Sequence, residues 1–147
     1  MENRKEFTFP SADGRTAIHA VEWHPAGEPA GILQIAHGVA EYALRYEPFA
    51  CFLNAHGFLV VANDHLGHGE SVAEGAPRLY FGENGSWQHV VDDMYTLRCR
   101  TGEAYPELPY FIMGHSMGSF LTRTYLIRYP GTVKGAILMG TGQNPDA

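Results

Sequence analysis

Continuous apolar runs alternate along this chain with segments in which apolar residues recur at helical spacing. The runs have a length typical of buried strands and occupy residues 31–36, 58–62, 110–113 and 133–139. Amphipathic helices are predicted over 46–56, over 87–100 and between Ser116 and Tyr129. Because each run is apolar throughout, the pattern indicates an α/β fold with a mostly parallel sheet covered on both faces.

The N-terminal part of the chain follows a different pattern. Residues 7–9 begin a strand, 11–14 have the composition of a turn, and 16–23 alternate between apolar and polar residues. This pattern predicts an antiparallel hairpin ahead of the parallel strands. A long irregular stretch rich in glycine, 64–83, later interrupts the alternation of strands and helices.

In two of the predicted helices, the spacing of apolar residues indicates which side chains face the core. In 87–100 the residues expected to point inward are Val90, Val91, Met94 and Leu97. Asp92 and Asp93 of the same helix are expected to be solvated or capping charges. In 46–56 an apolar face is formed by Phe49, Phe52 and Leu53.

Composition places the chain among ordinary globular proteins and excludes some partners. Of its 147 residues 45% are hydrophobic and 18% are charged, and the net charge of −6 argues against a nucleic-acid partner. No apolar run has the length of a signal peptide core or a transmembrane segment, so we expect a cytoplasmic protein. Cys51 and Cys99 fall in predicted helices and are expected to be reduced, buried thiols.

The pentapeptide Gly114-His115-Ser116-Met117-Gly118 joins the strand 110–113 to the helix that follows. Gly-x-Ser-x-Gly at such a junction is typical of a nucleophile elbow. This sharp turn holds a serine hydroxyl clear of the backbone, so that a base and a substrate can both reach it. The flanking glycines are required because strand and helix crowd together at the turn. The motif therefore predicts Ser116 as a nucleophile.

Two other polar loops follow predicted strands. His37–Val39 comes after the strand 31–36, and residues 64–69 come after the strand 58–62. Ligands of parallel sheets bind at the carboxyl ends of the strands. We therefore expect both loops and Ser116 to lie at one edge of the sheet.

Three motifs resemble the monoglyceride lipase and lysophospholipase group of α/β-hydrolases. They are His37-Gly38-Val39-Ala40-Glu41-Tyr42, Asn63-Asp64-His65-Leu66-Gly67-His68-Gly69-Glu70-Ser71 and Gly114-His115-Ser116-Met117-Gly118-Ser119. The resemblance extends from about Phe7 to the end of the chain. It implies a strand order of 1-2-4-3-5-6.

The resemblance also implies a role for each site residue. Ser116 would be the nucleophile, and the backbone N–H groups of Val39 and Met117 would form the oxyanion hole. The shape of the elbow and of the oxyanion loop would depend on His37, Gly38, Gly114, His115 and Gly118. No cofactor is implied.

By the same resemblance, several parts of the fold lie beyond Ala147: the catalytic acid and base, a lid and two further strands. The sequence after Gly118 contains no histidine. We therefore expect an α/β-hydrolase fold truncated after about the sixth strand, with 1–147 as the N-terminal part of a single domain. Strand 133–139 would then be an open apolar edge through which another chain could pair.

The remaining polar residues are expected to be structural. His65 and His68, with Asp64 and Glu70, match no standard zinc spacing, and we predict no metal site. His115 is expected to pack or to line the pocket.

His37 is the best local alternative as a base for Ser116. Glu41 and Arg45 lie four residues apart and predict a local ion pair.

The function expected from these features is a serine carboxylester hydrolase that acts on a monoacylglycerol, a lysophospholipid or a similar small acyl ester through an acyl-enzyme. Related thioesterases, aminopeptidases and haloperoxidases use the same elbow, and the fold does not choose among them. The alternative is a catalytically incompetent half-domain, either a fragment or an interaction module. A nucleotide binder is not supported, because the chain has no Gly-x-x-x-x-Gly-Lys-Ser/Thr motif.

Overall fold

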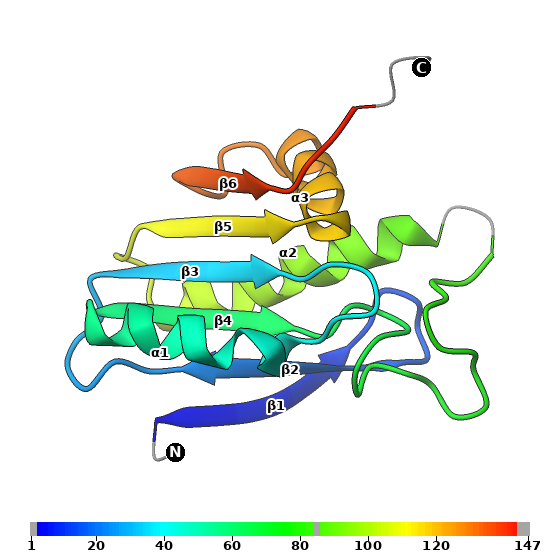
Figure 1. Cartoon of the computed structure of the whole chain (residues 1–147), viewed down its shortest axis with the longest axis horizontal. Helices are drawn as coiled ribbons and strands as arrows, with labels where there is room; N and C mark the ends of the chain where they lie inside the picture. The colour runs from blue at the N-terminus through cyan, green and yellow to red at the C-terminus, as the bar shows by residue number, and fades with distance from the viewer. Residues whose placement is uncertain (1–2, 84–85, 144–147) are drawn as a thin grey trace.

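The computed structural model of the chain describes residues 3–83 and 86–143. Within these residues the elements follow the expected alternation (Figure 1). In chain order they are β1 (Arg4–Pro10), β2 (Ala17–Trp23), β3 (Gly31–Ala36), the 3₁₀ turn η1 (Ala43–Tyr46), α1 (Glu47–Ala55), β4 (Phe58–Asn63), α2 (Trp87–Ala104), β5 (Tyr110–His115), α3 (Met117–Arg128) and β6 (Gly135–Met139).

The strands form one sheet in the order β1-β2-β4-β3-β5-β6, as predicted. β1 and β2 form the antiparallel hairpin, and β2 also pairs antiparallel with β4. The remaining pairs are parallel, so β3, β4, β5 and β6 all end at the same edge of the sheet (Figure 1). The loops expected to meet at that edge therefore do so.

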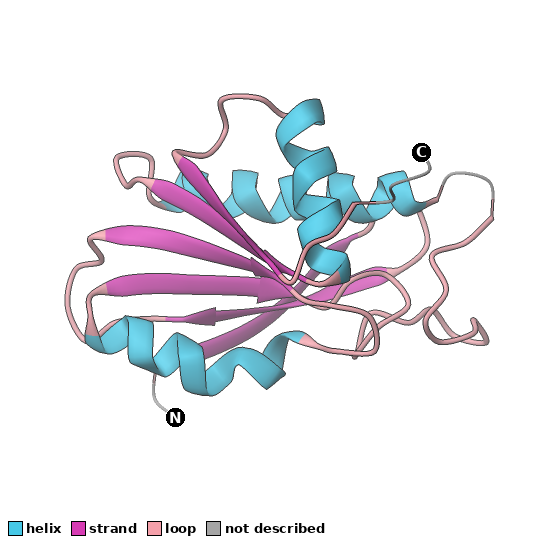
Figure 2. Ribbon diagram, turned by 45° about the horizontal axis from the view of Figure 1, so that its top comes forward, coloured by secondary structure: helices cyan, strands magenta, loops and turns pink. Residues whose placement is uncertain are grey.

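The sheet is covered on both faces, with α1 on one side and α2 and α3 on the other (Figure 2). Buried side chains of alternating strand positions fill the space on each side. On the α1 side they include Trp23, Leu33, Ile35, Val60 and Met113. On the α2 and α3 side they include Ile18, Ile32 and Ile112, which pack with Met94 of α2 and Tyr125 of α3 in one cluster. Burial of these apolar side chains is the main force that holds the two layers of helices on the sheet.

α2 differs from its expected description in two ways. The helix continues past Arg100 to Ala104, because the amide of Tyr105 still donates to Thr101. Asp93, expected to be solvated, is fully buried and accepts hydrogen bonds from Ser11 Oγ and the Ala12 N–H, both at 2.7 Å. The prediction for Asp93 was wrong because this side of the helix faces the β1–β2 turn.

Asp92 lies beside Asp93 and is also engaged by protein groups. It accepts a hydrogen bond from Tyr129 and forms an ion pair with Arg128, at 2.7 Å. Burial raises the pKa of Asp93 to about 6, although its two donors oppose that shift. Neither carboxylate caps the helix, so the charges of α2 tie it to its neighbours.

Other side chains are less buried than the pattern suggested. Cys51 and Cys99 lie in α1 and α2 as expected, but both are only partly buried. On α1, Phe49 and Phe52 are exposed although they share its apolar face. Within the described ranges, no helix is both long and apolar enough to cross a lipid bilayer.

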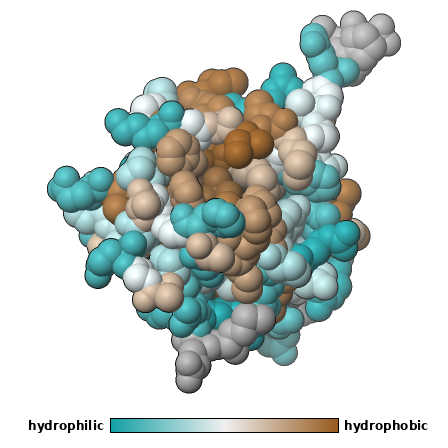
Figure 3. Space-filling model, turned by 60° about the vertical axis from the view of Figure 1, so that its left-hand side comes forward, coloured by the Kyte–Doolittle hydropathy of each residue, from teal (hydrophilic) through white to brown (hydrophobic). Residues whose placement is uncertain are grey.

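β6 lies at one edge of the described sheet and begins two residues later than expected. Its apolar side chains are open to solvent: 53% of Ile137, 38% of Leu138 and 45% of Met139 remain accessible. Beside it, an apolar groove of about 370 Å³ runs between α1 and the sheet, lined by Leu33, Phe49, Leu53, Phe58, Phe111 and Ile137. Apolar side chains gather in a hollowed patch on the face drawn in Figure 3.

Candidate functional site

Ser116 occupies a sharp turn between β5 and α3. Its backbone angles are φ 53° and ψ −120°, a region that non-glycine residues seldom adopt and that costs about 1–3 kcal/mol. The surrounding hydrogen bonds hold this conformation: the Ser116 N–H donates to Met139 O at 3.0 Å, and Ser119 donates to Ser116 O through both its N–H and its Oγ. Strain that is held in this way is typical of a functional turn.

The two glycines of the motif are required by close backbone contacts. A Cβ atom at Gly114 would lie 2.3 Å from the carbonyl oxygen of Gly118. A Cβ atom at Gly118 would lie 2.0 Å from the carbonyl oxygen of Ala36, on the neighbouring strand β3. Both distances are far below van der Waals contact, so no larger residue fits without moving the strand or the helix.

The loop after β3 passes directly over the elbow. A Cβ atom at Gly38 would lie 3.2 Å from Ser116 Cβ and 3.3 Å from His115 O. The loop turns back at Ala40, whose φ is 57°. Within the described residues, the N–H of Val39 donates to no acceptor. The N–H of Met117 opens α3, where the first amides have no carbonyl one turn back.

His37 is buried beneath this loop, and both of its ring nitrogens are used. Nδ1 donates to Gly38 O at 2.7 Å, and Nε2 accepts from the His65 N–H at 2.9 Å. Burial lowers the pKa of His37 to about 4, so the ring is neutral at pH 7. Both ring nitrogens of His37 are therefore hydrogen-bonded, and neither is free to act as a base for Ser116.

The hydroxyl of Ser116 has no hydrogen-bond partner among the described residues. The neighbouring ring of His115 is turned to a carboxylate instead, with Nδ1 3.4 Å from Glu41 Oε2. Glu41 also forms the predicted ion pair with Arg45, at 3.2 Å. In the part of the chain that the structure describes, the Ser116 hydroxyl is therefore not hydrogen-bonded to any side chain that could accept its proton.

The loop after β4 is organised by Asp64. Its carboxylate accepts hydrogen bonds from the Ala43 N–H, the Glu70 N–H and His19 Nδ1 at 2.7–2.9 Å. A Cβ atom at Gly69 would lie 2.2 Å from Asp64 Oδ2, so the loop closes tightly around this side chain. Among the described residues, no group of three or more His, Cys, Asp or Glu side chains is placed to hold a metal ion.

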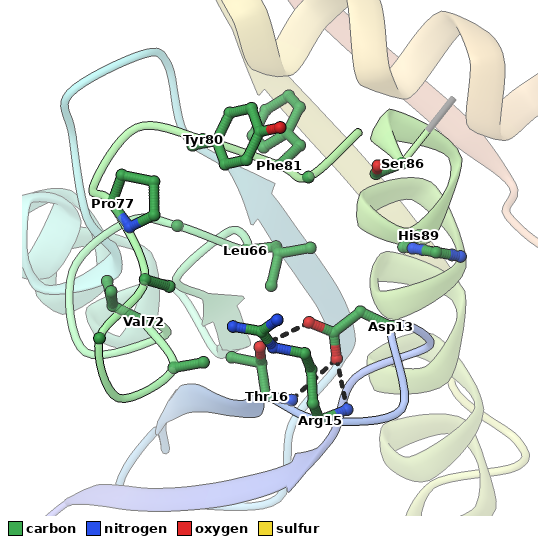
Figure 4. Close-up of a pocket in the computed structure, with 15 residues that line it drawn as sticks. Asp13, Arg15, Thr16, Leu66, Val72, Pro77, Tyr80, Phe81, Ser86 and His89 are labelled. Atoms are coloured by element: carbon green, nitrogen blue, oxygen red, sulfur yellow. Dashed lines mark hydrogen bonds between the residues drawn. The ribbon is translucent and has the colours of Figure 1, made fainter. Parts of the chain in front are cut away.

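A separate cavity of about 290 Å³ lies between the 64–83 loop, the β1–β2 turn and the start of α2 (Figure 4). Its walls are mostly apolar and include Leu66, Val72, Pro77, Tyr80 and Phe81. Asp13, which lines its rim, already accepts from the amides of Arg15 and Thr16. This cavity shares no lining residue with the elbow or the loop after β3.

Sequence reasoning missed the contacts of Glu41. The sequence predicts for this side chain only an ion pair with Arg45. In the structure its Oε2 accepts from the Gly38 N–H at 2.7 Å and from Tyr46 Oη at 2.9 Å. Gly38 and Glu41 lie three residues apart in one motif, and this spacing was the available signal. The donor is a backbone N–H, however, and a pattern of side chains does not reveal backbone hydrogen bonds.

Comparisons with known proteins agree with this geometry. A family described as "Serine aminopeptidase, S33" matches residues 27–147. The monoacylglycerol lipase of Mycolicibacterium smegmatis is 36% identical over 141 residues, which cover 96% of this chain and 48% of the relative. The human monoglyceride lipase is 34% identical over 129 residues, which cover 88% of this chain and 40% of the relative.

Solved structures give the same result. A thermostable carboxyl esterase from Bacillus coagulans superposes with a TM-score of 0.89 and 37% identity, over 97% of this chain and 46% of the esterase. An epoxide hydrolase from Vigna radiata, at 20% identity and a TM-score of 0.72, shares the fold alone. The chain thus spans less than half the length of these relatives. From its motifs, its fold and these matches, the chain belongs to the serine aminopeptidase S33 family of α/β-hydrolases.

Proposed function

We propose that this chain supplies the nucleophile and the oxyanion hole of a serine carboxylester hydrolase. Ser116 attacks the ester carbonyl, and the N–H groups of Val39 and Met117 stabilise the negative charge that develops on its oxygen. The strained conformation of Ser116 beneath the loop after β3 is the observation that carries the proposal. An amide without an internal acceptor at Val39 supports the assignment of the oxyanion hole.

The proposed substrate is an uncharged acyl ester of the monoacylglycerol class. This choice is supported by relatives named monoacylglycerol lipase and carboxyl esterase at 36% and 37% identity. The proposed reaction proceeds through an acyl-enzyme, in which the Ser116 oxygen bonds to the acyl carbon and the alcohol leaves with a proton. Water then releases the fatty acid and restores the serine.

The general base of this reaction is assigned to a group outside the described residues. Support comes from the Ser116 hydroxyl, which has no partner here, and from His37, whose ring nitrogens are both occupied. Loss of the base from a serine protease triad costs about 10⁶ in kcat, while about 10³–10⁴ over water remains from the oxyanion hole and binding. The 147-residue chain by itself is therefore expected to be a weak catalyst.

Hydrolysis of p-nitrophenyl butyrate and 1-monooleoylglycerol, with and without imidazole, tests this proposal. Imidazole can act as a soluble base. We expect turnover that depends on Ser116 and rises about tenfold or more with imidazole, relative to the background measured with Ser116→Ala. Equal rates for the two proteins at every imidazole concentration would contradict the proposal and favour the non-catalytic alternative.

We further propose that β6 pairs with a strand of another polypeptide segment. Its open edge and its solvent-exposed side chains on both faces resemble a strand from inside a parallel sheet. Because the Ser116 N–H donates to Met139 O at the end of β6, a parallel strand added here would end close to Ser116. This position favours the same segment as the source of further site residues.

A further inference from the structure

The carboxylate of Glu41 lies between the loop after β3 and the elbow. Oε2 accepts hydrogen bonds from the Gly38 N–H at 2.7 Å and from Tyr46 Oη at 2.9 Å, and it lies 3.4 Å from His115 Nδ1. Gly38 precedes Val39 in the loop, and His115 precedes Ser116 in the elbow. One side chain therefore connects the two backbone segments that must keep a fixed distance.

Gly38 is held tightly between these two segments. A Cβ atom built on it would lie 3.0 Å from Glu41 Oε2 and 3.2 Å from Ser116 Cβ. The bond from its N–H to a carboxylate is charge-assisted and about twice as strong as a neutral one. The Gly38 N–H and the Val39 N–H belong to adjacent peptide planes that share the Gly38 Cα atom, so an anchored and closely packed Gly38 limits where the Val39 amide can lie.

We propose that Glu41 is a positioning residue, which holds the Val39 amide of the oxyanion loop at its working distance from Ser116. The assignment rests on the proposed function, because it concerns the same oxyanion hole. In this role Glu41 acts through its hydrogen bond with Gly38.

The ion pair with Arg45 does not account for this carboxylate. The side chain of Arg45 is 62% exposed, whereas that of Glu41 is 14% exposed. Exposed ion pairs contribute little because solvent screens them. The partners that lie on the buried side are Gly38, Tyr46 and His115.

The surroundings of Glu41 keep it ionised. Burial raises the pKa of the Glu41 carboxyl, but hydrogen bonds from Gly38, Tyr46 and His115 outweigh that effect and leave the pKa lowered. The charged or titratable groups that face the carboxylate are Arg45, Tyr46 and His115. The bond to Gly38 is therefore present throughout the neutral range.

The test compares Glu41→Gln with Glu47→Gln in the full chain. Glu47 is a matched control, since its side chain is 17% exposed and pairs with Arg4 at 2.8 Å, outside the loop. In the imidazole-supported hydrolysis of p-nitrophenyl butyrate, we expect Glu41→Gln to lower kcat about tenfold or more. The upper limit is the loss of one oxyanion donor, about 10²–10³. KM should stay within about twofold, and Glu47→Gln should leave both constants unchanged.

A purely structural role for Glu41 would give a different result. Unchanged kcat in Glu41→Gln, an equal loss in Glu47→Gln, or a change in KM alone would each overturn the assignment. If the unsubstituted chain itself shows no turnover that depends on Ser116, the proposed function fails. A second readout then tests whether Glu41 holds the loop in place.

That readout is the amide resonance of Gly38 in nuclear magnetic resonance spectra. In the unsubstituted chain it should move as Glu41 titrates at acid pH, and in Glu41→Gln this movement should be lost. If Glu41→Gln does not fold, Tyr46→Phe serves instead, because it removes one donor and should raise the midpoint of the Gly38 titration. A Gly38 resonance that does not respond to the titration of Glu41 would overturn the proposal.

Discussion

The carboxyl edge of the sheet and its lateral edge at β6 differ in how well contacts within the chain pair their polar groups and bury their apolar side chains. At the carboxyl edge, backbone and side-chain hydrogen bonds hold Ser116, His37 and Gly38, while the Ser116 hydroxyl and the Val39 amide have no partner in residues 3–83 and 86–143. At β6, apolar side chains face solvent on both sides of the strand. The first region is organised by contacts within the described chain, whereas the second leaves apolar surface that the proposed pairing of β6 would bury.

The closest packing at the carboxyl edge gives the largest expected effect. Gly118→Ala should lower the free energy of unfolding by about 3 kcal/mol or more, because its Cβ would lie 2.0 Å from Ala36 O. Urea denaturation followed by circular dichroism measures this change. Gly27→Ala is the control, since no atom lies within 4 Å of the added Cβ, and its stability should not fall. Equal stability of the two variants would show that the elbow is not tightly packed.

Acid should weaken the carboxyl edge before it affects β6. The folded pKa of His37 is lowered to about 4, and that of His65 is also lowered, so the folded state binds fewer protons than the unfolded state below about pH 6.5. Stability should therefore fall as the pH drops from about 6.5 to 4, on the order of 3 kcal/mol for His37 alone.

Urea midpoints measured between pH 7 and pH 4 test this dependence. His37→Gln should be less stable at pH 7 but should show a smaller loss on acidification. His56→Gln, at the exposed end of α1, should keep the slope of the unsubstituted chain. Asp93 opposes the trend, because its pKa is raised to about 6 and its contribution to stability falls as the pH rises. Parallel slopes for all three proteins would contradict the account of His37.

A charged substitution on the lateral edge should reduce association of the chain and hardly change its stability. Ile137→Lys places a charge on β6 and should shift the chain toward the monomer in analytical ultracentrifugation, while the free energy of unfolding changes by less than about 0.5 kcal/mol. Ile127→Lys is the control, because Ile127 is also exposed but belongs to helix α3 and not to the edge strand. A monomeric unsubstituted chain at every concentration would argue against self-association through β6.

The order of the strands was implied by the family resemblance. The strands themselves, the hairpin and the position of the elbow could be predicted from the sequence directly. Each depends on a local pattern: continuous apolar runs, turn residues, or glycines at fixed spacing around Ser116. The burial of Val90, Val91, Met94 and Leu97 followed from helical spacing in the same way.

Contacts between distant segments could not be predicted in this manner. Asp93 is buried because the β1–β2 turn supplies two donors, and nothing near it in the chain indicates them. Glu41 accepts from Gly38 through a backbone amide, which every residue except proline carries. His37 is unsuited to act as a base because Gly38 and His65 occupy its ring nitrogens, and the contact with His65 joins two separate loops.

The central claim is that this chain positions a serine capable of attacking an ester, and trapping of the acyl-enzyme tests it most directly. The chain is incubated with p-nitrophenyl butyrate and imidazole, and its intact mass and peptide masses are then measured. We predict one butyryl group on the peptide that contains Ser116, and none on that peptide in Ser116→Ala. An unmodified chain, or the same modification in Ser116→Ala, would contradict the account.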